Sequence, residues 1–181
     1  MPKRLFIGLE LPPPLRETLA ALDPRIKGLR WLPAEQMHLT MSFLGDVDRD
    51  AEELLRDALA PVRVGEFFLP VEGMGAFGGA RPTVVWAGVG KGHPHLFALH
   101  KHIQDAVLHA GLEADLKPFH PHITIGRVPR GSNLSRQVLL PFLRKHADVE
   151  FGLCKITGFT LFSSMLSPQG ASHNAELRVT F

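Results

Sequence analysis

The sequence predicts an α+β fold built on antiparallel sheets. Segments with helical spacing and segments with strand-like alternation are interspersed along the chain. Apolar and polar residues alternate within the strands, which is typical of sheets with one open face rather than of buried parallel sheets. The chain has 181 residues, of which 45% are hydrophobic and 21% are charged. We therefore expect a single domain over residues 1–181, or two small lobes that share a core.

Local patterns place the first elements. A strand over 3–11 precedes a helix from about residue 14, because prolines are favoured in a first helical turn. The alternating stretch 37–45 predicts a second strand, and Asp48 can cap the helix that follows it. The apolar positions of this helix, which we expect to face the core, are Leu54, Leu55, Ala58 and Leu59.

The later elements follow by the same reasoning. A Gly/Pro-rich loop joins two predicted strands, 66–74 and 83–89. A helix over 94–112 stops at Gly111. The remaining predicted elements are a strand over 122–128, a helix over 132–146 and three strands over 149–153, 156–165 and 177–181.

Composition excludes several classes of protein. No apolar run approaches the ~18 residues that cross a bilayer, so we expect no membrane partner. The N-terminal segment has the pattern of a first strand and not of a signal peptide. The single cysteine, Cys154, excludes an internal disulfide and predicts a buried, inert thiol, and a cytoplasmic location is the simplest interpretation. The formal charge of +2 indicates no broad basic surface for duplex nucleic acid.

One pattern, His-apolar-Thr-apolar, occurs twice. It begins at His38 in "HLTM" and at His122 in "HITI", each in a predicted strand that precedes a predicted helix. This repetition suggests two similar halves. Residues i and i+2 share one face of a strand, so His38 lies beside Thr40 and His122 beside Thr124. Alternation would extend the first polar face to Ser42 and would direct the other side chains to the core: Leu39, Met41, Phe43, Ile123 and Ile125.

Two such strands that face each other would carry the parts needed to cleave a phosphoester. One imidazole can accept a proton while the other donates one. Threonine hydroxyls can donate hydrogen bonds to phosphate oxygens. A strained cyclic phosphate would need no metal. A single His-x-Thr triplet is weak evidence, and the alternative is that each histidine caps its strand and bonds locally.

The sequence resembles the two-histidine phosphoesterases, in particular the RNA 2′,3′-cyclic phosphodiesterases that were historically called 2′-5′ RNA ligases. The similarity runs through most of the chain. The segments that carry it are "RLFIGLELP", "RWLPAEQMHLTMSFLGDV", "GMGAFGGARPTVVWAGV", "FHPHITIGRV" and "FTLFSSMLSPQG".

The resemblance implies a bilobal α+β fold with a pseudo-two-fold duplication. Two antiparallel sheets would line a central groove, with helices packed on the outer faces. It implies that His38 and His122 are the catalytic acid–base pair, with His38 as donor and His122 as acceptor. Thr40, Thr124 and Arg127 would bind the substrate. Phe43 matches a family aromatic near the groove, although alternation directs it to the core.

The sequence departs from the family at one place. The family often carries a tyrosine in its last strand, and this chain has no tyrosine. His173 and Asn174 stand in that region instead. The departure leaves the histidine chemistry intact and puts the base-binding part of the site in question.

Other candidate residues have simpler interpretations. The helix over 94–112 contains four histidines, but no pair has the spacing of a zinc motif, so a solvated face is favoured. His120 fits a loop histidine beside the motif, and Arg130 fits a surface charge as well as a ligand. Trp31 and Trp86 fit the core better than a base-stacking platform.

Three functions remain open at this point. The first is a metal-independent phosphodiesterase that opens 2′,3′-cyclic phosphates of RNA ends or small nucleotides and leaves a 2′-phosphate. The second is 2′-5′ RNA ligation, the same chemistry in reverse. The third is a non-catalytic binder of RNA ends, which would not need two titrating groups. We expect no cofactor, no metal, RNA or cyclic nucleotides as partners, and a monomer.

Overall fold

The computed structural model describes residues 1–90, 92–168 and 170–181. Gln169, part of one segment that carries the family resemblance, lies outside the described residues. Helices and strands are interspersed, and every pairing of strands is antiparallel, so the predicted α+β class is confirmed. The elements are β1 (Lys3–Glu10), α1 (Pro13–Ala20), β2 (Arg30–Trp31), the 3-10 turn η1 (Ala34–Gln36), β3 (His38–Val47), α2 (Arg49–Leu59), β4 (Phe67–Phe77), β5 (Val84–Val89), α3 (Pro94–His109), β6 (His122–Arg127), α4 (Arg136–Lys145), β7 (Glu150–Ile156), β8 (Gly158–Ser167) and β9 (Gly170–Thr180).

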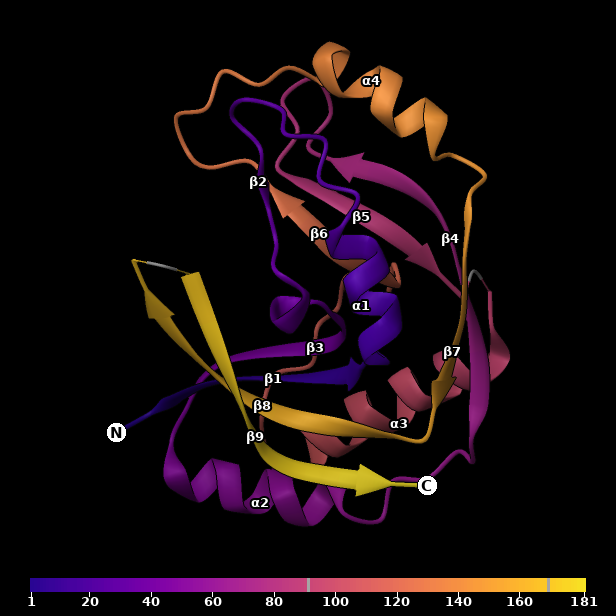
Figure 1. Ribbon diagram of the computed structural model, residues 1–181. Helices are drawn as coiled ribbons and strands as arrows, with labels where there is room; N and C mark the ends of the chain where they lie inside the picture. Colours follow the sequence, from indigo (N-terminus) through magenta and orange to yellow (C-terminus); the bar gives the residue numbers. More distant parts are fainter. Residues whose placement is uncertain (91, 169) are drawn as a thin grey trace.

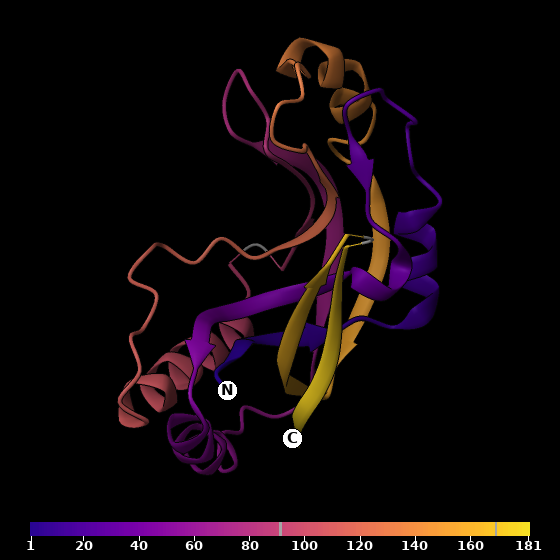
Figure 2. The same ribbon diagram turned by 90° about the vertical axis from the view of Figure 1, so that its left-hand side faces the viewer.

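The strands follow one continuous path in the order β7-β4-β5-β6-β3-β1-β8-β9, with β2 paired to β6. The strands therefore form one continuous sheet and not the two separate sheets that we expected. The strands fall into two groups, one of β4 to β7 and one of β1, β3, β8 and β9. In Figure 1, β5, β6 and the upper part of β4 lie above the second group, β7 runs down the right-hand side, and Figure 2 shows the strong curl between the two groups. The two groups meet at β3 and β6, which share a single residue pair, Leu39 with Ile123. The motif strands are thus neighbours at the point where the sheet changes direction.

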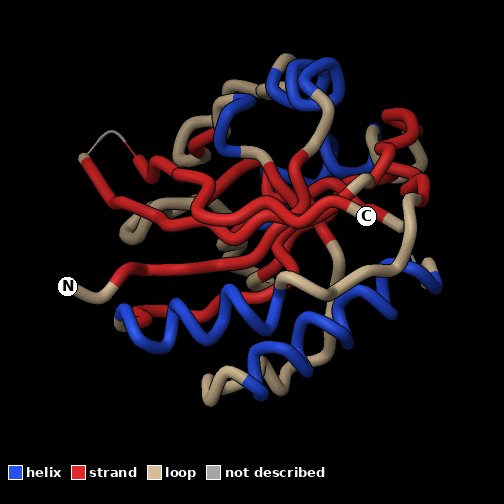
Figure 3. Tube along the Cα trace, turned by 90° about the horizontal axis from the view of Figure 1, so that it is seen from below, coloured by secondary structure: helices blue, strands red, loops and turns tan. Residues whose placement is uncertain are grey.

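Helices flank the strands on two sides, as seen in Figure 3. Helix α2 begins as predicted, since the Asp48 carboxylate accepts a hydrogen bond of 2.9 Å from the Ala51 amide. Leu55 and Leu59 are fully buried, but Leu54 is 59% exposed, so its predicted place in the core is wrong. The buried stripe instead includes Glu52, whose carboxylate is paired with Lys3 and Arg56.

Two predicted boundaries were also wrong. Helix α4 begins at Arg136 and not at residue 132, because Ser132 belongs to a turn and its hydroxyl donates to the Gly28 carbonyl. Strand β9 begins at Gly170 and not at residue 177, so β8 and β9 form a long hairpin. The added part of β9, residues 170–176, is largely polar and contains no buried residue, so it lacks the apolar alternation on which the prediction depended. No helix among the described residues is long and apolar enough to cross a membrane.

Candidate functional site

The five site residues predicted from the sequence line one groove of about 600 Å³ at the junction of β3 and β6. His38 and Thr40 enter it from β3, and His122, Thr124 and Arg127 from β6. Because Leu39 pairs with Ile123 in antiparallel strands, His38 lies across from Thr124 and Thr40 across from His122. The structure thus brings two imidazole–hydroxyl pairs together on one surface.

The two imidazoles are held in the same way. Nδ1 of His38 lies 3.0 Å from the carbonyl oxygen of Gln36, and Nδ1 of His122 lies 2.7 Å from that of His120. A carbonyl only accepts, so each Nδ1 carries a proton and donates it to the residue two positions earlier. The neutral ring then has an unprotonated Nε2. Each histidine can therefore take or give a proton through Nε2 without losing its orientation.

His38 lies in an aromatic enclosure. Its ring is 4.8 Å from that of Phe6 and makes an edge-on contact of 5.2 Å with the ring of His173. Gly8 lies beside the ring, since a Cβ there would be in ordinary contact with it at 3.5 Å. Burial, followed by the charge that His173 can carry, lowers the pKa of His38 to about 4. His38 is thus neutral at pH 7 in the free protein.

His122 has a different neighbourhood. Phe77 approaches it edge-on at 4.9 Å, and the ring of His120 lies 6.1 Å away. Burial is the main cause that lowers the pKa of His122, and its hydrogen bond to the His120 carbonyl opposes that shift. The shift at His38 is the larger one. The two imidazoles therefore differ in proton affinity although their hydrogen bonds are alike.

The groove is positively charged. Arg4, Arg30 and Arg127 line it, and no Asp or Glu is among its described lining residues. Arg30 and Arg127 are direct cross-strand partners, a like-charge arrangement that is normally destabilising. Burial and the nearby Arg30 lower the pKa of Arg127 from its ordinary value. Such a cluster fits an anion with several oxygens, because guanidinium groups bind phosphate well.

The predicted direction of two residues of β3 was wrong. Phe43 is 63% exposed and lines the groove, whereas Ser42 is 3% exposed and belongs to the interior. The pairing of β1 with β3 skips Met41, between Thr40 and Ser42, so the strand bulges there. An extra residue shifts the alternation by one position, and Phe43 joins the face of His38. The family match had placed this aromatic near the groove, which simple alternation did not.

The other candidates lie apart from the groove. His95, His102 and His109 are solvent-exposed on α3, as predicted, and no group of side chains suited to a metal occurs among the described residues. Cys154 is buried, and burial raises the pKa of its thiol to about 11, which fits the predicted inert thiol. Arg130 is exposed and is not among the residues that line the groove.

The tryptophans divide between two roles. Trp31 packs against the core and donates a hydrogen bond of 3.1 Å from Nε1 to the Leu19 carbonyl, as expected for a structural residue. Trp86 instead lines a second cavity on the same half of the sheet as His122, together with His120. The expectation that Trp86 is simply a core residue is therefore wrong.

Sequence reasoning missed part of the groove. Arg4 and Arg30 lie far from both motifs in the sequence, and only the strand pairing brings them to the groove. His173 was noted only as a replacement for the family tyrosine, yet its ring contacts His38 and its buried Nδ1 has no hydrogen-bond partner among the described residues. Its position in the region of the family tyrosine was the one signal available.

Comparison with known proteins places the chain in a family. The family model described as the 2′-5′ RNA ligase superfamily matches residues 11–163. The chain belongs to this superfamily. A relative from Archaeoglobus fulgidus, named RNA 2′,3′-cyclic phosphodiesterase, is 30% identical over 97% of this chain and 98% of its own. An Escherichia coli protein of the same name is 31% identical over 84% of this chain and 86% of its own.

Solved structures from the superfamily share the fold. A crystal structure of E. coli LigT in apo form has a TM-score of 0.79 at 25% identity and covers 99% of this chain and 97% of its own. LigT complexed with 3′-AMP has a TM-score of 0.80 at 25% identity and covers 100% and 99% of the two chains. The likeness extends over both halves of the curled sheet.

Proposed function

We propose that this protein hydrolyses 2′,3′-cyclic phosphates of RNA ends or small nucleotides to 2′-phosphomonoesters, without a metal. The observation that carries the proposal is the pair of imidazoles, each fixed through Nδ1, in a groove lined by three arginines. The names of the relatives from Archaeoglobus fulgidus and Escherichia coli support this activity. The complex of LigT with 3′-AMP supports nucleotide binding in a fold of this kind.

The geometry suggests how the bond is broken. One imidazole takes a proton from water through Nε2 while the water oxygen attacks phosphorus. The bond from phosphorus to the 3′-oxygen breaks, and the other imidazole donates its proton to that oxygen. Thr40 and Thr124 donate hydrogen bonds to the non-bridging oxygens, and Arg127 with Arg30 stabilises their charge as it increases. The product is a 2′-phosphate with a free 3′-hydroxyl.

The roles of the two histidines follow from their proton affinities in the presence of substrate. The family resemblance implies that His38 donates. In the free protein the pKa of His38 is about 4, so a bound phosphate anion has to raise it before His38 can donate at pH 7. The three arginines also lie near this phosphate and limit that effect. In the absence of substrate, His122 is the one that more readily carries a proton.

Two further expectations belong to this proposal. Both motifs come from one chain, so a monomer over residues 1–181 has the complete groove and no partner copy is needed. Ligation would follow the same steps with the 5′-hydroxyl of a second RNA strand in place of water: that hydroxyl loses its proton to one imidazole and attacks phosphorus, the bond to the 3′-oxygen breaks and this oxygen takes a proton from the other imidazole, and a 2′-5′ linkage forms. A cyclic-phosphate end that is joined rather than hydrolysed in the presence of such a strand would favour that alternative.

The test uses an oligonucleotide that ends in a 2′,3′-cyclic phosphate, in buffer with EDTA. We expect conversion to a 2′-phosphate, and a loss of about 10² to 10⁴ in rate in His38→Ala and in His122→Ala. His102→Ala, an exposed histidine of α3, is the matched control and should keep full activity. Full activity in either motif variant would refute the paired mechanism. Binding of the end without turnover by the wild type would favour a non-catalytic binder.

A further inference from the structure

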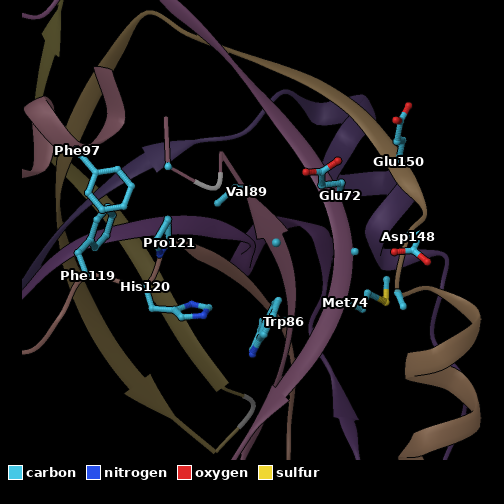
Figure 4. A pocket seen from close by; sticks show the side chains of 14 residues that line it. Glu72, Met74, Trp86, Val89, Phe97, Phe119, His120, Pro121, Asp148 and Glu150 are labelled. Carbon is cyan, nitrogen blue, oxygen red and sulfur yellow. The ribbon is translucent and has the colours of Figure 1, made fainter. Parts of the chain in front are cut away.

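A second cavity of about 780 Å³ lies beside the groove, within the size range of small-ligand sites. Figure 4 shows its two ends. Phe97, Phe119 and His120 lie toward one end, and Trp86 lies nearer the middle. The carboxylates of Glu72, Asp148 and Glu150 lie at the other. None of these side chains takes part in the proposed phosphate chemistry.

Strand pairing places this cavity directly beside the two motif residues of β6. Trp86 of β5 is the cross-strand partner of Thr124, and Gly88 is the partner of His122. Direct partners point to the same face of a sheet. Glu72 of β4 is the partner of Gly88, so its backbone lies two strands, or about 10 Å, from that of His122. This distance is on the scale of one nucleoside.

Gly88 keeps the way between the two sites open. It stands between His122 and Glu72 in this row of strands and has no side chain. A Cβ at this position would come within 2.6 Å of the Glu72 carbonyl oxygen, so the backbones pack too closely for any other residue. Gly88 itself therefore places no side chain between the phosphate groove and the acidic end, and the edge of the Trp86 ring lies beside it, with Cζ3 3.6 Å from that Cβ position.

The two cavities have opposite charge. The groove has three arginines and no carboxylate, whereas the second cavity has three carboxylates and no arginine or lysine among its described lining residues. Glu72 and Glu150 are direct cross-strand partners, and neither makes an ion pair with another described residue. Carboxylates only accept hydrogen bonds when ionised. A phosphate therefore fits the groove, and an uncharged group rich in N–H donors fits the cavity.

The aromatic end suits a flat ring. The Trp86 indole lies on Gly75, where a Cβ would overlap it, and the ring of His120 approaches it edge-on at 5.3 Å. Nε1 of Trp86 is buried and has no hydrogen-bond partner among the described residues. Nucleobases in single-stranded RNA are held by stacking on such rings and by hydrogen bonds to their Watson–Crick edge.

We propose that this cavity holds the base of the nucleoside that carries the cyclic phosphate, and that it selects guanine. The inference rests on the proposed phosphodiesterase function and names the substrate that the same site prefers. Guanine presents N1–H and the N2 amino group side by side, a fork of two donors that one carboxylate can accept. Glu72 and Glu150 read this edge, while Trp86 and His120 hold the ring. Uracil lacks the amino group and gains less from the acidic end.

The test compares the 2′,3′-cyclic monophosphates of guanosine, inosine and uridine. Inosine differs from guanosine only in the missing N2 amino group. We expect kcat/KM for guanosine to exceed that for inosine about tenfold, as for a hydrogen bond to a charged acceptor. Glu72→Gln or Glu150→Gln should remove that difference, and should lower the value for guanosine much more than the value for uridine. Glu113→Gln, an exposed carboxylate away from the cavity, is the matched control.

The possible results distinguish a failure of the guanine inference from a failure of the proposed function. Equal kcat/KM for guanosine and inosine in the wild type would overturn the inference, as would variants that slow guanosine and uridine equally. In both cases hydrolysis that depends on His38 and His122 would leave the proposed function standing. If neither a cyclic nucleotide nor an oligonucleotide that ends in a 2′,3′-cyclic phosphate is hydrolysed, the proposed function fails instead. Binding of guanosine 2′-monophosphate, measured by calorimetry and weakened in Glu72→Gln, would then still support the cavity, and unchanged binding would overturn it.

A second readout does not depend on turnover. The chain has two tryptophans, so Trp31→Phe leaves Trp86 as the only source of indole emission. Guanosine 2′-monophosphate should quench that emission as it saturates the site, because its base stacks near the ring. Competitive inhibition by the same nucleotide without any change in emission would place the base elsewhere.

Discussion

At the scale of single residues, His173 is the neighbour that most distinguishes the two imidazoles. The ring of His173, which comes from β9, contacts the ring of His38. Among the described contacts, no ring from β9 contacts His122. The groups that lower the pKa of His38 after burial are His173, Arg127 and His122, and the Gln36 carbonyl raises it. A single side chain of the hairpin therefore shifts the proton affinity of one member of the pair.

Replacement of His173 by phenylalanine should raise the pKa of His38. The ring contact is kept and the positive charge is removed, so the protonated form of His38 costs less. We expect the His38 titration followed by NMR to move to higher pH, and the limb of the bell-shaped rate profile that His38 governs to move with it. His102→Phe should change neither. An unchanged His38 titration in His173→Phe would show that His173 does not contribute to the lowered pKa of His38.

At the scale of elements, strand β3 shows what the sequence could and could not predict. The His-x-Thr pattern correctly predicts that His38 and Thr40 share a face, because the strand is regular up to Thr40. Beyond it, the bulge at Met41 reverses the alternation, and nothing in "MSFLG" marks a bulge. A bulge is fixed by the partner strand, here β1, so its position depends on the tertiary structure.

The bulge makes Met41 and Phe43 a matched pair of large apolar residues with opposite roles. Met41 is 2% exposed, so Met41→Ala should lower the free energy of unfolding by about 2–5 kcal/mol through a cavity in the core. Phe43 is 63% exposed, so Phe43→Ala should change it by no more than about 0.5 kcal/mol. Urea unfolding measures both changes.

The two substitutions should affect KM in the opposite order to their effect on stability. Phe43 lines the groove, so Phe43→Ala should raise KM for a cyclic-phosphate oligonucleotide. Met41→Ala, measured where it is fully folded, should leave KM unchanged. A large loss of stability in Phe43→Ala, with KM as in the wild type, would mean that the side chain belongs to the core after all.

At the scale of the whole molecule, the sequence predicted the class of fold and the two motif strands, but not how the halves join. Alternation, caps and turns are local, and they predicted most strands and helices to within a few residues. The order of strands and the single Leu39–Ile123 pair between the halves depend on contacts between distant segments. The same contacts bring Arg4, Arg30 and His173 to the groove. A local pattern therefore indicates the motifs. The charged and titratable side chains around them are brought together only when the whole sheet has formed.

The groove should also make the stability of the protein depend on pH. A histidine with a lowered pKa binds its proton more weakly in the folded than in the unfolded chain, so protonation favours unfolding. For His38 this cost is absent above the unfolded pKa of about 6.5. It grows as the pH falls toward the folded value of about 4. Burial lowers the pKa of His100, His122 and His173 as well, which adds in the same direction.

We therefore expect the free energy of unfolding, measured in urea, to be lower at pH 5 than at pH 7.5. In His38→Gln this difference should shrink by about 2 kcal/mol, because a group with no proton to bind replaces the one whose pKa is shifted most. His102→Gln, which replaces an exposed imidazole, should keep the full difference. If His38→Gln also kept it, His38 would be as easily protonated in the folded protein as in the unfolded chain. The groove would then hold a charged imidazole at pH 5 at no cost to the fold.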